Sequence, residues 1–210
     1  MTDEKVTDFQ EIAVTEKPCG PSEHRLQYSY KFSCFFRPAG DFSSENYSRY
    51  VQPIAIVNSV EQFWNVYCHL VRPSDLKKRG EIHFFKKDIN PTWEAEENKK
   101  GGKWIVRLQK GLCSRIWENL LLAMIGEQFL VGDEICGAVC SVRNAEAILS
   151  LWNKSADNPG VLNRLREVLG RVLCLPADTM IEYKCHDDCL KDQSNYRHAN
   201  RNVYLYNEVI

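Results

Sequence analysis

The sequence predicts an α+β domain, in which a curved antiparallel sheet of about eight strands carries three helices on one face. Two kinds of pattern support this fold class: seven or eight segments with period-two or short apolar runs, and three segments with helical spacing. Several strands follow one another directly, which favours antiparallel pairing over parallel crossovers. A chain of 210 residues fits one such domain.

The first strand follows an acidic tail. Residues 1–24 hold six carboxylates, a Pro18-Cys-Gly-Pro21 break and no apolar period, so we expect this tail to be disordered. From Leu26 to Phe36 apolar and polar residues alternate, which is typical of a half-buried strand. We expect the folded domain to span residues 25–190, and residues 191–210 to finish it with a loop and a strand.

The next elements are separated by clear turn and cap signals. Residues 37–50 are polar and predict a loop, and 54–57 predict a short strand. Ser59-Val-Glu-Gln62 matches a capping box, so a helix begins here and ends before Pro73. Residues 81–87 predict the following strand.

The central region combines strands with the strongest helical signal. A loop begins at Asn90 and precedes a strand over 103–109. Residues 114–126 place apolar side chains along one helical face and end at a glycine. Strands are expected at 135–142 and 147–152, although the second could be helical because Ala, Glu and Leu favour helices.

The last elements complete the sheet. Asp157-Asn-Pro-Gly160 begins a third helix, whose apolar side runs to Leu173 before Pro176 ends it. Residues 179–184 and 202–207 predict the final strands.

Composition excludes several classes of function. With 27 Lys and Arg against 28 Asp and Glu, the net charge is -1, which argues against long contacts with a nucleic-acid backbone but not against a pocket for one nucleotide. The acidic start lacks an apolar run and no stretch approaches the roughly 20 residues of a membrane span, so we expect a soluble, cytoplasmic protein. Nine scattered Cys predict reduced core residues.

Motifs of catalysis are missing from the sequence. It contains no phosphate-binding loop, dinucleotide fingerprint, zinc-protease motif or nucleophile elbow, so we expect no enzyme and no cofactor. Cys185 and Cys189, with His198 further on, could be metal ligands. A second Cys pair at matching spacing is missing, so no metal site is predicted.

One loop contains an aromatic residue that needs an explanation. Trp93 stands in a strongly polar segment beside the carboxylate of Glu94. It could cover the edge of the core, or it could be a stacking platform. An aromatic face next to a carboxylate suits a purine, because the ring stacks while the acid accepts hydrogen bonds from N1 and N2 of guanine.

Several long motifs follow one another along the chain. They are Ser59-Val-Glu-Gln-Phe-Trp64, Val71-Arg-Pro-Ser-Asp-Leu76, Asn90-Pro-Thr-Trp93-Glu94, Asn98-Lys-Lys-Gly-Gly-Lys-Trp104, Trp117-Glu-Asn-Leu-Leu-Leu-Ala-Met-Ile-Gly-Glu127 and Cys136-Gly-Ala-Val-Cys-Ser-Val-Arg143. Together they resemble the eukaryotic translation initiation factor 4E family of messenger-RNA cap-binding proteins, from about His24 to about Lys184. The resemblance implies a curved eight-stranded sheet with three helices on its convex face, and a concave site for the 7-methylguanosine cap of messenger RNA.

The resemblance also implies how the base would be held. Methylation at N7 makes the base cationic, so two aromatic rings can sandwich it by stacking and cation–π attraction. Trp93 matches one wall, Glu94 matches the carboxylate that reads the guanine edge, and Trp152 matches the ring against the N7 methyl group. Most members have Trp as the opposite wall, whereas the candidate here is Tyr47, with Tyr50 as the alternative.

The phosphate side departs from most members of the family. Arg143 matches a phosphate-binding arginine, and Lys103 stands where an arginine is typical. Two lysines that usually follow are replaced by Ala145 and Ile148. Well-made charge-assisted hydrogen bonds contribute roughly 1.5–3 kcal/mol each, and about 1.4 kcal/mol is a factor of ten. We therefore expect cap binding at least about tenfold weaker than in a typical member.

These departures resemble the class of 4E-homologous proteins, which includes the plant novel cap-binding protein. Members of this class mostly repress specific messages, so a weaker-binding, repressor-type regulator of translation is our leading hypothesis. The first alternative is an active initiation factor that recruits the scaffold factor to the cap. A remote alternative is an enzyme that acts on capped nucleotides.

The family has a second site on its helices, for partner proteins that contain a Tyr-x-x-x-x-Leu-apolar helix. Residues four apart on a helix share a face, which suits a groove for such a partner. Trp64 could instead be a core residue, and Asn119 and Glu118 depart from the usual groove residues, so we expect an altered choice of partner by a monomer. The matching residues are His24, Val60, Trp64, Asn119, Leu122 and Gly126.

Overall fold

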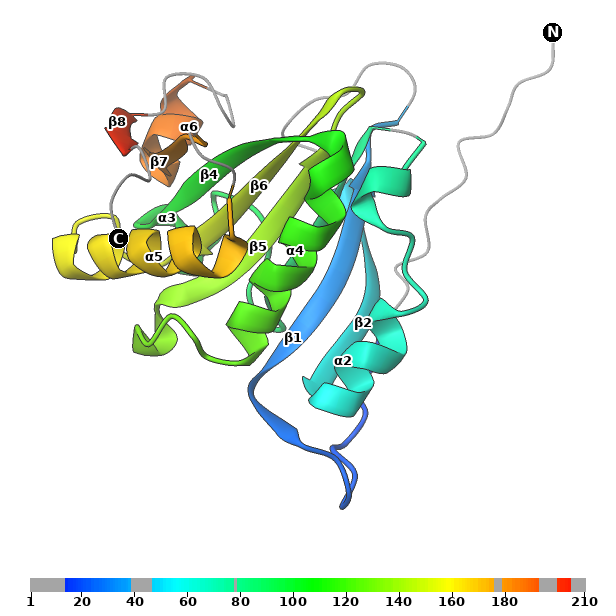
Figure 1. Ribbon diagram of the computed structural model, residues 1–210. Coiled ribbons are helices and arrows are strands. Elements are labelled where there is room, and N and C mark those ends of the chain that lie inside the picture. Colours follow the sequence, from blue (N-terminus) through cyan, green and yellow to red (C-terminus); the bar gives the residue numbers. More distant parts are fainter. Residues whose placement is uncertain (1–13, 39–46, 78, 176–178, 193–199, 205–210) are drawn as a thin grey trace, which may run out of the picture.

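The computed structural model describes residues 14–38, 47–77, 79–175, 179–192 and 200–204 (Figure 1). Its centre is a curved eight-stranded sheet in the order β2-β1-β3-β5-β6-β4-β7-β8, with every neighbouring pair antiparallel. The predicted α+β class is therefore confirmed. The strands are β1 (Arg25–Phe36), β2 (Val51–Ser59), β3 (Gly80–Lys86), β4 (Gly102–Gln109), β5 (Ile135–Val142), β6 (Glu146–Asn153), β7 (Ile181–Cys185) and β8 (Asn200–Tyr204).

Three longer helices lie across one face of the sheet (Figure 1). They are α2 (Val60–Tyr67), α4 (Lys110–Ile125) and α5 (Pro159–Leu173). Short helical segments connect the strands: α1 (Tyr47–Tyr50), α3 (Glu96–Lys99), α6 (His186–Asp192), and the 3-10 turns η2 (Pro73–Asp75) and η3 (Gly132–Glu134). No helix in the described parts of the chain is long and apolar enough to cross a membrane.

Local signals position the first and last of the longer helices. The Ser59 hydroxyl accepts a hydrogen bond from the backbone N–H of Gln62 at 3.1 Å, as the capping box predicts. The Gln62 side chain accepts from the backbone N–H of Asn58 at 3.2 Å, one residue earlier than in the usual motif. At α5, the Asn158 side chain accepts from the N–H of Val161 at 3.2 Å, so both helix starts are capped.

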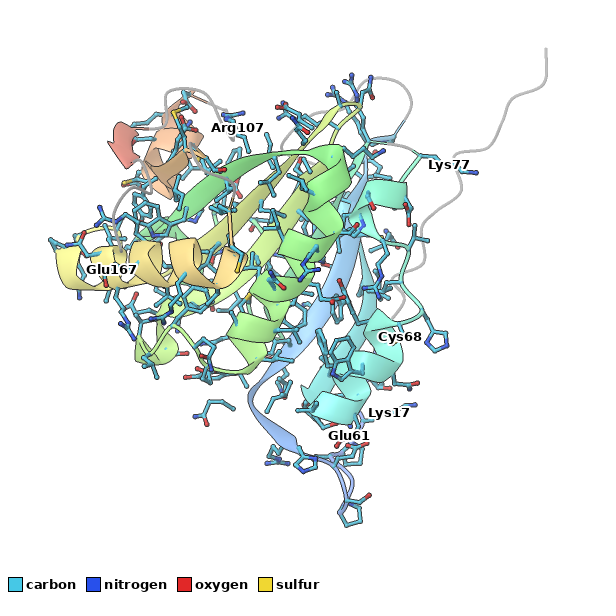
Figure 2. The ribbon with its side chains drawn as sticks, viewed as in Figure 1. Lys17, Glu61, Cys68, Lys77, Arg107 and Glu167 are labelled. Atoms are coloured by element: carbon cyan, nitrogen blue, oxygen red, sulfur yellow. The ribbon has the colours of Figure 1, made fainter. Side chains whose placement is uncertain are left out.

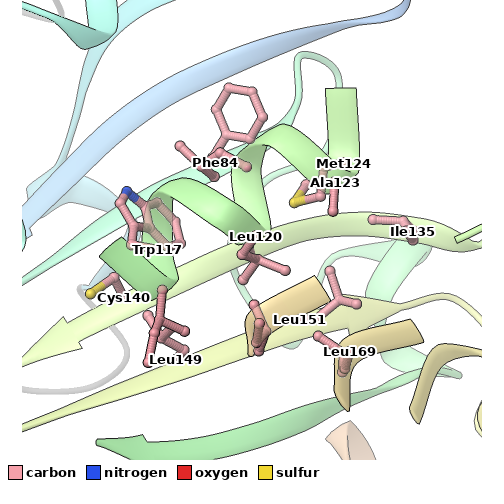
Figure 3. Close-up of a cluster of buried hydrophobic side chains, with 14 of the residues drawn as sticks. Phe84, Trp117, Leu120, Ala123, Met124, Ile135, Cys140, Leu149, Leu151 and Leu169 are labelled. Carbon is pink, nitrogen blue, oxygen red and sulfur yellow. The ribbon is translucent and has the colours of Figure 1, made fainter. Parts of the chain in front are cut away.

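The core lies between the three helices and the sheet (Figure 3). Trp117 and Leu120 of α4 meet Phe84 of β3 and Leu151 of β6, and all four are almost completely buried. Successive residues of a strand point to opposite faces of the sheet. The residues before and after each core-facing residue therefore point to the opposite face. We call that opposite face the open face. It carries the polar and aromatic side chains discussed below.

Several elements differ from the sequence-based expectations. Residues 47–50 form α1 rather than loop, and β2 begins at Val51 and includes Pro53, which an edge strand tolerates. Helix α4 begins at Lys110 rather than at residue 114. The sequence pattern does not reveal this first turn, because Gly111 and Leu112 are exposed and do not extend the apolar period of the helix. Residues 147–152 belong to strand β6, so the helical alternative for them is wrong.

The expectation of a disordered tail does not hold for residues 14–24, while residues 1–13 lie outside the described chain. The Glu16 carboxylate accepts hydrogen bonds from Ser29 (2.5 Å), Asn58 (3.0 Å) and Lys87 (2.8 Å). These bonds lower the pKa of Glu16 to about 2, against the opposing effect of burial. Composition does not reveal this attachment, because all three partners are distant in sequence.

Candidate functional site

An aromatic cluster occupies the open face at one end of the sheet. Phe85 of β3, Val139 of β5 and Trp152 of β6 form it, and Trp93 packs against it from the loop that follows β3. The Trp152 ring meets the Phe85 ring edge-on, with 5.3 Å between the centroids. Trp93 is only half-buried. It therefore covers the edge of this cluster and still presents part of its ring outside.

The loop that carries Trp93 is folded around a buried asparagine. The Asn98 side chain donates hydrogen bonds to the backbone carbonyls of Asn90 and Thr92, both at 2.7 Å. Asn98 is fully buried, so these bonds fix the loop where the sequence suggests only a polar connection. The neighbouring Glu94 is exposed. The loop thus carries a half-buried indole ring and an exposed carboxylate at consecutive positions.

A lysine ammonium lies near both indole rings of the cluster. The Lys103 Nζ atom is 5.5 Å from the centroid of Trp93 and 5.3 Å from that of Trp152. Burial lowers the pKa of Lys103 to about 8, and the charge of Lys184 lowers it further, while Cys189 and Glu81 oppose the shift. Since the π faces of indole attract cations, this part of the open face already accommodates a positive charge between two tryptophans.

Tyr47 lies on the same face, beside this cluster. Its hydroxyl donates a hydrogen bond to Glu81 at 2.7 Å and lies 3.0 Å from Nε2 of His83, and its ring is 4.6 Å from that of Phe35. His83 and Phe85 are alternate residues of β3, about 7 Å apart on one face. The structure therefore places Tyr47 beside His83, one alternate position along β3 from Phe85 of this cluster. Tyr50, the alternative, is half-buried at the end of α1.

The carboxylate that holds Tyr47 belongs to a buried polar network. Burial raises the pKa of the Glu81 carboxyl, but hydrogen bonds from His83, Tyr47 and Ser141 and the His83 charge outweigh it, so the pKa lies below its usual value. The other ring nitrogen of His83 is 3.2 Å from the Ser33 hydroxyl. Tyr47 is thus attached to the sheet through groups that the sequence analysis did not single out.

Of the two predicted phosphate residues, Lys103 lies within the aromatic cluster and Arg143 lies farther along the sheet. Arg143 is in the turn between β5 and β6, half-exposed, with Nη1 3.2 Å from Glu146 Oε1. Sequence reasoning missed Arg107, which lies directly opposite Ile148 in the β4–β6 pairing and at the β4 side of the molecule (Figure 2). Arg107 and Lys103 share the open face, since they are four residues apart on β4. Only the strand register reveals that Arg107 adjoins the position where Ile148 replaces a lysine.

The predicted partner residues gather on the helix-covered side. Val60, Trp64 and Leu122 are half-buried and pack against the main core. Trp64 meets the rings of Phe63 and Tyr67 edge-on, at 5.3 and 5.9 Å. Both interpretations of Trp64 therefore describe part of it, because much of its side chain packs against the core and part of it is accessible.

The remaining predicted partner residues are His24, which contacts the start of α2, Asn119 in the middle of α4, and Gly126 at the end of α4. His24 is hydrogen-bonded through Nδ1 to Glu61 at 2.7 Å, and its carbonyl accepts from the N–H of Val60. The pKa of His24 is raised, because Glu61 favours the protonated ring. Asn119 is half-buried on α4, and Gly126 ends that helix.

An ion pair that the sequence analysis missed borders the groove. Arg72 binds Glu118 at 3.1 Å, and its guanidinium stacks over Tyr67 at 4.3 Å. Glu118 stands in α4, so the pair joins this helix to the segment that follows α2. It adds a charged feature to a surface that otherwise consists of half-buried apolar groups.

The candidate metal ligands Cys185 and Cys189 lie at the junction of β7 and α6. Cys185 ends β7 and Cys189 is buried in α6, whereas His198 lies outside the described residues. Within those residues, no group of three or more His, Cys, Asp and Glu side chains is arranged to hold a metal ion.

Together these features define a class of protein: a sheet-based protein with an aromatic, partly basic candidate ligand site on one face and half-buried apolar side chains on the helices behind it. Residues 25–201 match the model of the family described as Eukaryotic initiation factor 4E. The chain therefore belongs to the eukaryotic initiation factor 4E family, and the resemblance in its motifs is confirmed.

Similar proteins agree with this assignment. The chain is 58% identical to eukaryotic translation initiation factor 4E-4 of Caenorhabditis elegans over 192 residues, covering 91% of each protein. It is 42% identical to initiation factor NCBP of Arabidopsis thaliana, covering 92% of this chain and 87% of the relative. Among solved structures, C. elegans eIF4E-3 bound to the 4E-binding protein Mextli and a cap analog superposes with a TM-score of 0.76, at 30% identity, over 81% of this chain and 96% of that one. Ascaris suum eIF4E-3 with an m2,2,7G cap gives 0.73, at 32% identity, over 78% and 92%.

The lowered pKa of Lys103 makes a prediction for the protein without a ligand. We expect its side chain to lose its proton near pH 8, against about 10.5 in an unfolded chain. Between these values the unfolded chain binds more protons, so this residue's contribution to the free energy of unfolding rises with pH.

NMR titration of the lysine side-chain signals measures this pKa directly, and the Lys103→Arg variant identifies the signal by its loss. A Lys103 signal that titrates near pH 10.5 would contradict the buried position between the tryptophans.

Proposed function

We propose that the protein binds the 7-methylguanosine cap of messenger RNA on the open face. The observation that carries this proposal is the Lys103 ammonium, which lies 5.5 and 5.3 Å from the centroids of Trp93 and Trp152. A methylated guanine carries a delocalised positive charge, so it suits the same aromatic surroundings. The exposed carboxylate of Glu94 next to Trp93 can accept the hydrogen bonds of the guanine N1 and N2 donors.

In this proposal each ring has a distinct role. Trp93 stacks on the base through its accessible part, and Trp152 meets the N7 methyl group at the floor of the site. Tyr47 supplies the second wall, because it already lies on the same face one alternate position along β3. The hydrogen bonds to Glu81 and His83 would fix the hydroxyl end of that ring while its face turns toward the base.

The phosphates would extend along basic side chains of the open face. Lys103 and Arg143 are the residues that match the family, and we add Arg107, which supplies a cation beside Ile148. Arg107 pairs with Glu182 at 3.5 Å, so part of its charge is already satisfied. With Ala145 and Ile148 in place of lysines and a tyrosine wall, we expect weaker cap binding than in a typical family member.

This ligand makes the protein a regulator of translation in the cytoplasm. We favour a weaker-binding, repressor-type role, supported by the altered groove residues Glu118 and Asn119. The half-buried apolar surface of Val60, Trp64 and Leu122 suits a partner with a Tyr-x-x-x-x-Leu-apolar helix. Recruitment of the scaffold factor through this groove would instead identify an active initiation factor.

Substitutions in the loop after β3 test cap binding. We expect Trp93→Ala to lose roughly 1–3 kcal/mol of stacking, or about 5- to 150-fold in affinity, and Glu94→Ala to lose at least tenfold. Retention on a cap-analogue resin and fluorescence titration measure both.

Glu96→Ala is the matched control, because it removes an exposed carboxylate two residues from Glu94. Full retention of Trp93→Ala on the resin would refute this site, and equal losses for Glu94→Ala and Glu96→Ala would refute the role of Glu94.

The groove makes a separate prediction. Trp64→Ala is expected to lose at least tenfold in affinity for a peptide with the Tyr-x-x-x-x-Leu-apolar pattern, because large aromatic residues dominate such interfaces. Cap retention should remain, since Trp64 lies on the opposite side of the sheet from Trp93.

Leu112→Ala, which trims an exposed apolar side chain in the first turn of α4, is the control for this experiment. A Trp64→Ala variant that pulls down every partner of the wild-type protein would contradict the groove assignment.

A further inference from the structure

Three open-face side chains form a row across neighbouring strands. The pairing of β4 places Lys103 directly opposite Trp152 of β6 on one side and Lys184 of β7 on the other. Directly opposite side chains in antiparallel strands lie about 5 Å apart. The two lysines are therefore neighbours, and both are almost completely buried. Two buried ammonium groups that lie next to each other repel each other and lose their hydration, so a nearby negative charge stabilises them.

Helix α6 supplies that negative charge from above the row. The Asp192 carboxylate accepts from Lys184 Nζ at 2.6 Å, and its side chain remains 26% exposed. His186 packs on Trp152, with 4.3 Å between the ring centroids, and the Cys189 thiol interacts with Lys103. Helix α6 thus covers all three members of the row.

The fit of this helix is imperfect at its buried start. Both ring nitrogens of His186 are buried, and in the described part of the chain the ring makes no hydrogen bond of good geometry, with only the Gly102 backbone close enough to interact with it. Burial lowers the pKa of His186 to about 3, so the ring is neutral and adds no charge to the row. An unsatisfied buried polar group costs free energy. Helix α6 therefore covers the row with a neutral, incompletely hydrogen-bonded ring at its start.

We propose that α6 is a cover over the row of Trp152, Lys103 and Lys184, in which the Asp192 carboxylate holds Lys184 until the phosphate chain of the ligand displaces it. This inference rests on the proposed function, because it needs a cap nucleotide at Trp93 and Trp152. Lys184 becomes an additional phosphate-binding residue, and Asp192 an internal competitor of the same charge as the phosphates.

The proposal predicts that the effect of Asp192 depends on the number of phosphates. A carboxylate that competes for Lys184 opposes a triphosphate, but it has nothing to displace when the ligand is a nucleoside. Asp192→Asn removes the competing charge and keeps the size of the side chain. A purely structural role of Asp192 would instead alter the affinities for both ligands in parallel.

Fluorescence titration of the full chain with 7-methylguanosine and with its triphosphate tests this. We expect Asp192→Asn to bind the triphosphate three- to tenfold more tightly and the nucleoside within twofold of wild type. Asp187→Asn, the same change at an exposed position of α6, should leave both affinities unchanged. Equal or weaker triphosphate binding by Asp192→Asn, or an equal gain by Asp187→Asn, would overturn the proposal.

A second variant keeps the proposal testable if Asp192→Asn fails to fold. Lys184→Met should weaken triphosphate binding at least threefold and leave nucleoside binding unchanged, whereas an unchanged triphosphate affinity would overturn the role of Lys184. These outcomes differ from a failure of the proposed function. In that case the wild-type protein itself would bind neither ligand, and the inference would fall with it.

Discussion

The site depends on the register with which β4 pairs with β6 and β7. This register aligns Trp152, Lys103 and Lys184 in one row and sets Arg107 beside Ile148. Because side chains alternate along a strand, the same register directs Trp104 and Leu151 into the core behind the row. A slip of one residue would exchange the two sets. The burial of Trp104 and Leu151 is therefore what holds the aromatic and basic side chains on the open face.

The candidate ligand site and the candidate partner surface lie on opposite faces of the sheet. On one side, the loop around Asn98 presents Trp93 and Glu94, and buried strands support Trp152. On the other, Trp64 of α2 and Leu122 of α4 pack partly against the core and remain partly accessible. Both surfaces rest on one continuous sheet, so a ligand and a protein partner can bind at the same time without competing for the same residues.

Local patterns in the sequence predicted most of the fold and only part of the site. Period-two alternation predicted β1, the capping box at Ser59 predicted the start of α2, and the polar loop singled out Trp93. Residues that act through distant partners left no local signal. Glu16 binds side chains from β1, β2 and the turn after β3. Arg107 lies opposite Ile148 only through the strand pairing, and α6 covers Lys184 with a charged segment that has little apolar period. Their contacts exist only once the chain has folded.

Binding of a methylated, cationic base at Trp93 and Trp152 can be measured at the indole N–H groups of these two residues. The chain has five tryptophans, so five indole N–H signals are available to NMR. On addition of 7-methylguanosine diphosphate, we expect the signals of Trp93 and Trp152 to shift strongly and those of Trp64 and Trp117 to stay in place, with a much weaker response to unmethylated guanosine diphosphate. Equal responses to the two nucleotides, or shifts centred on Trp64, would contradict the account.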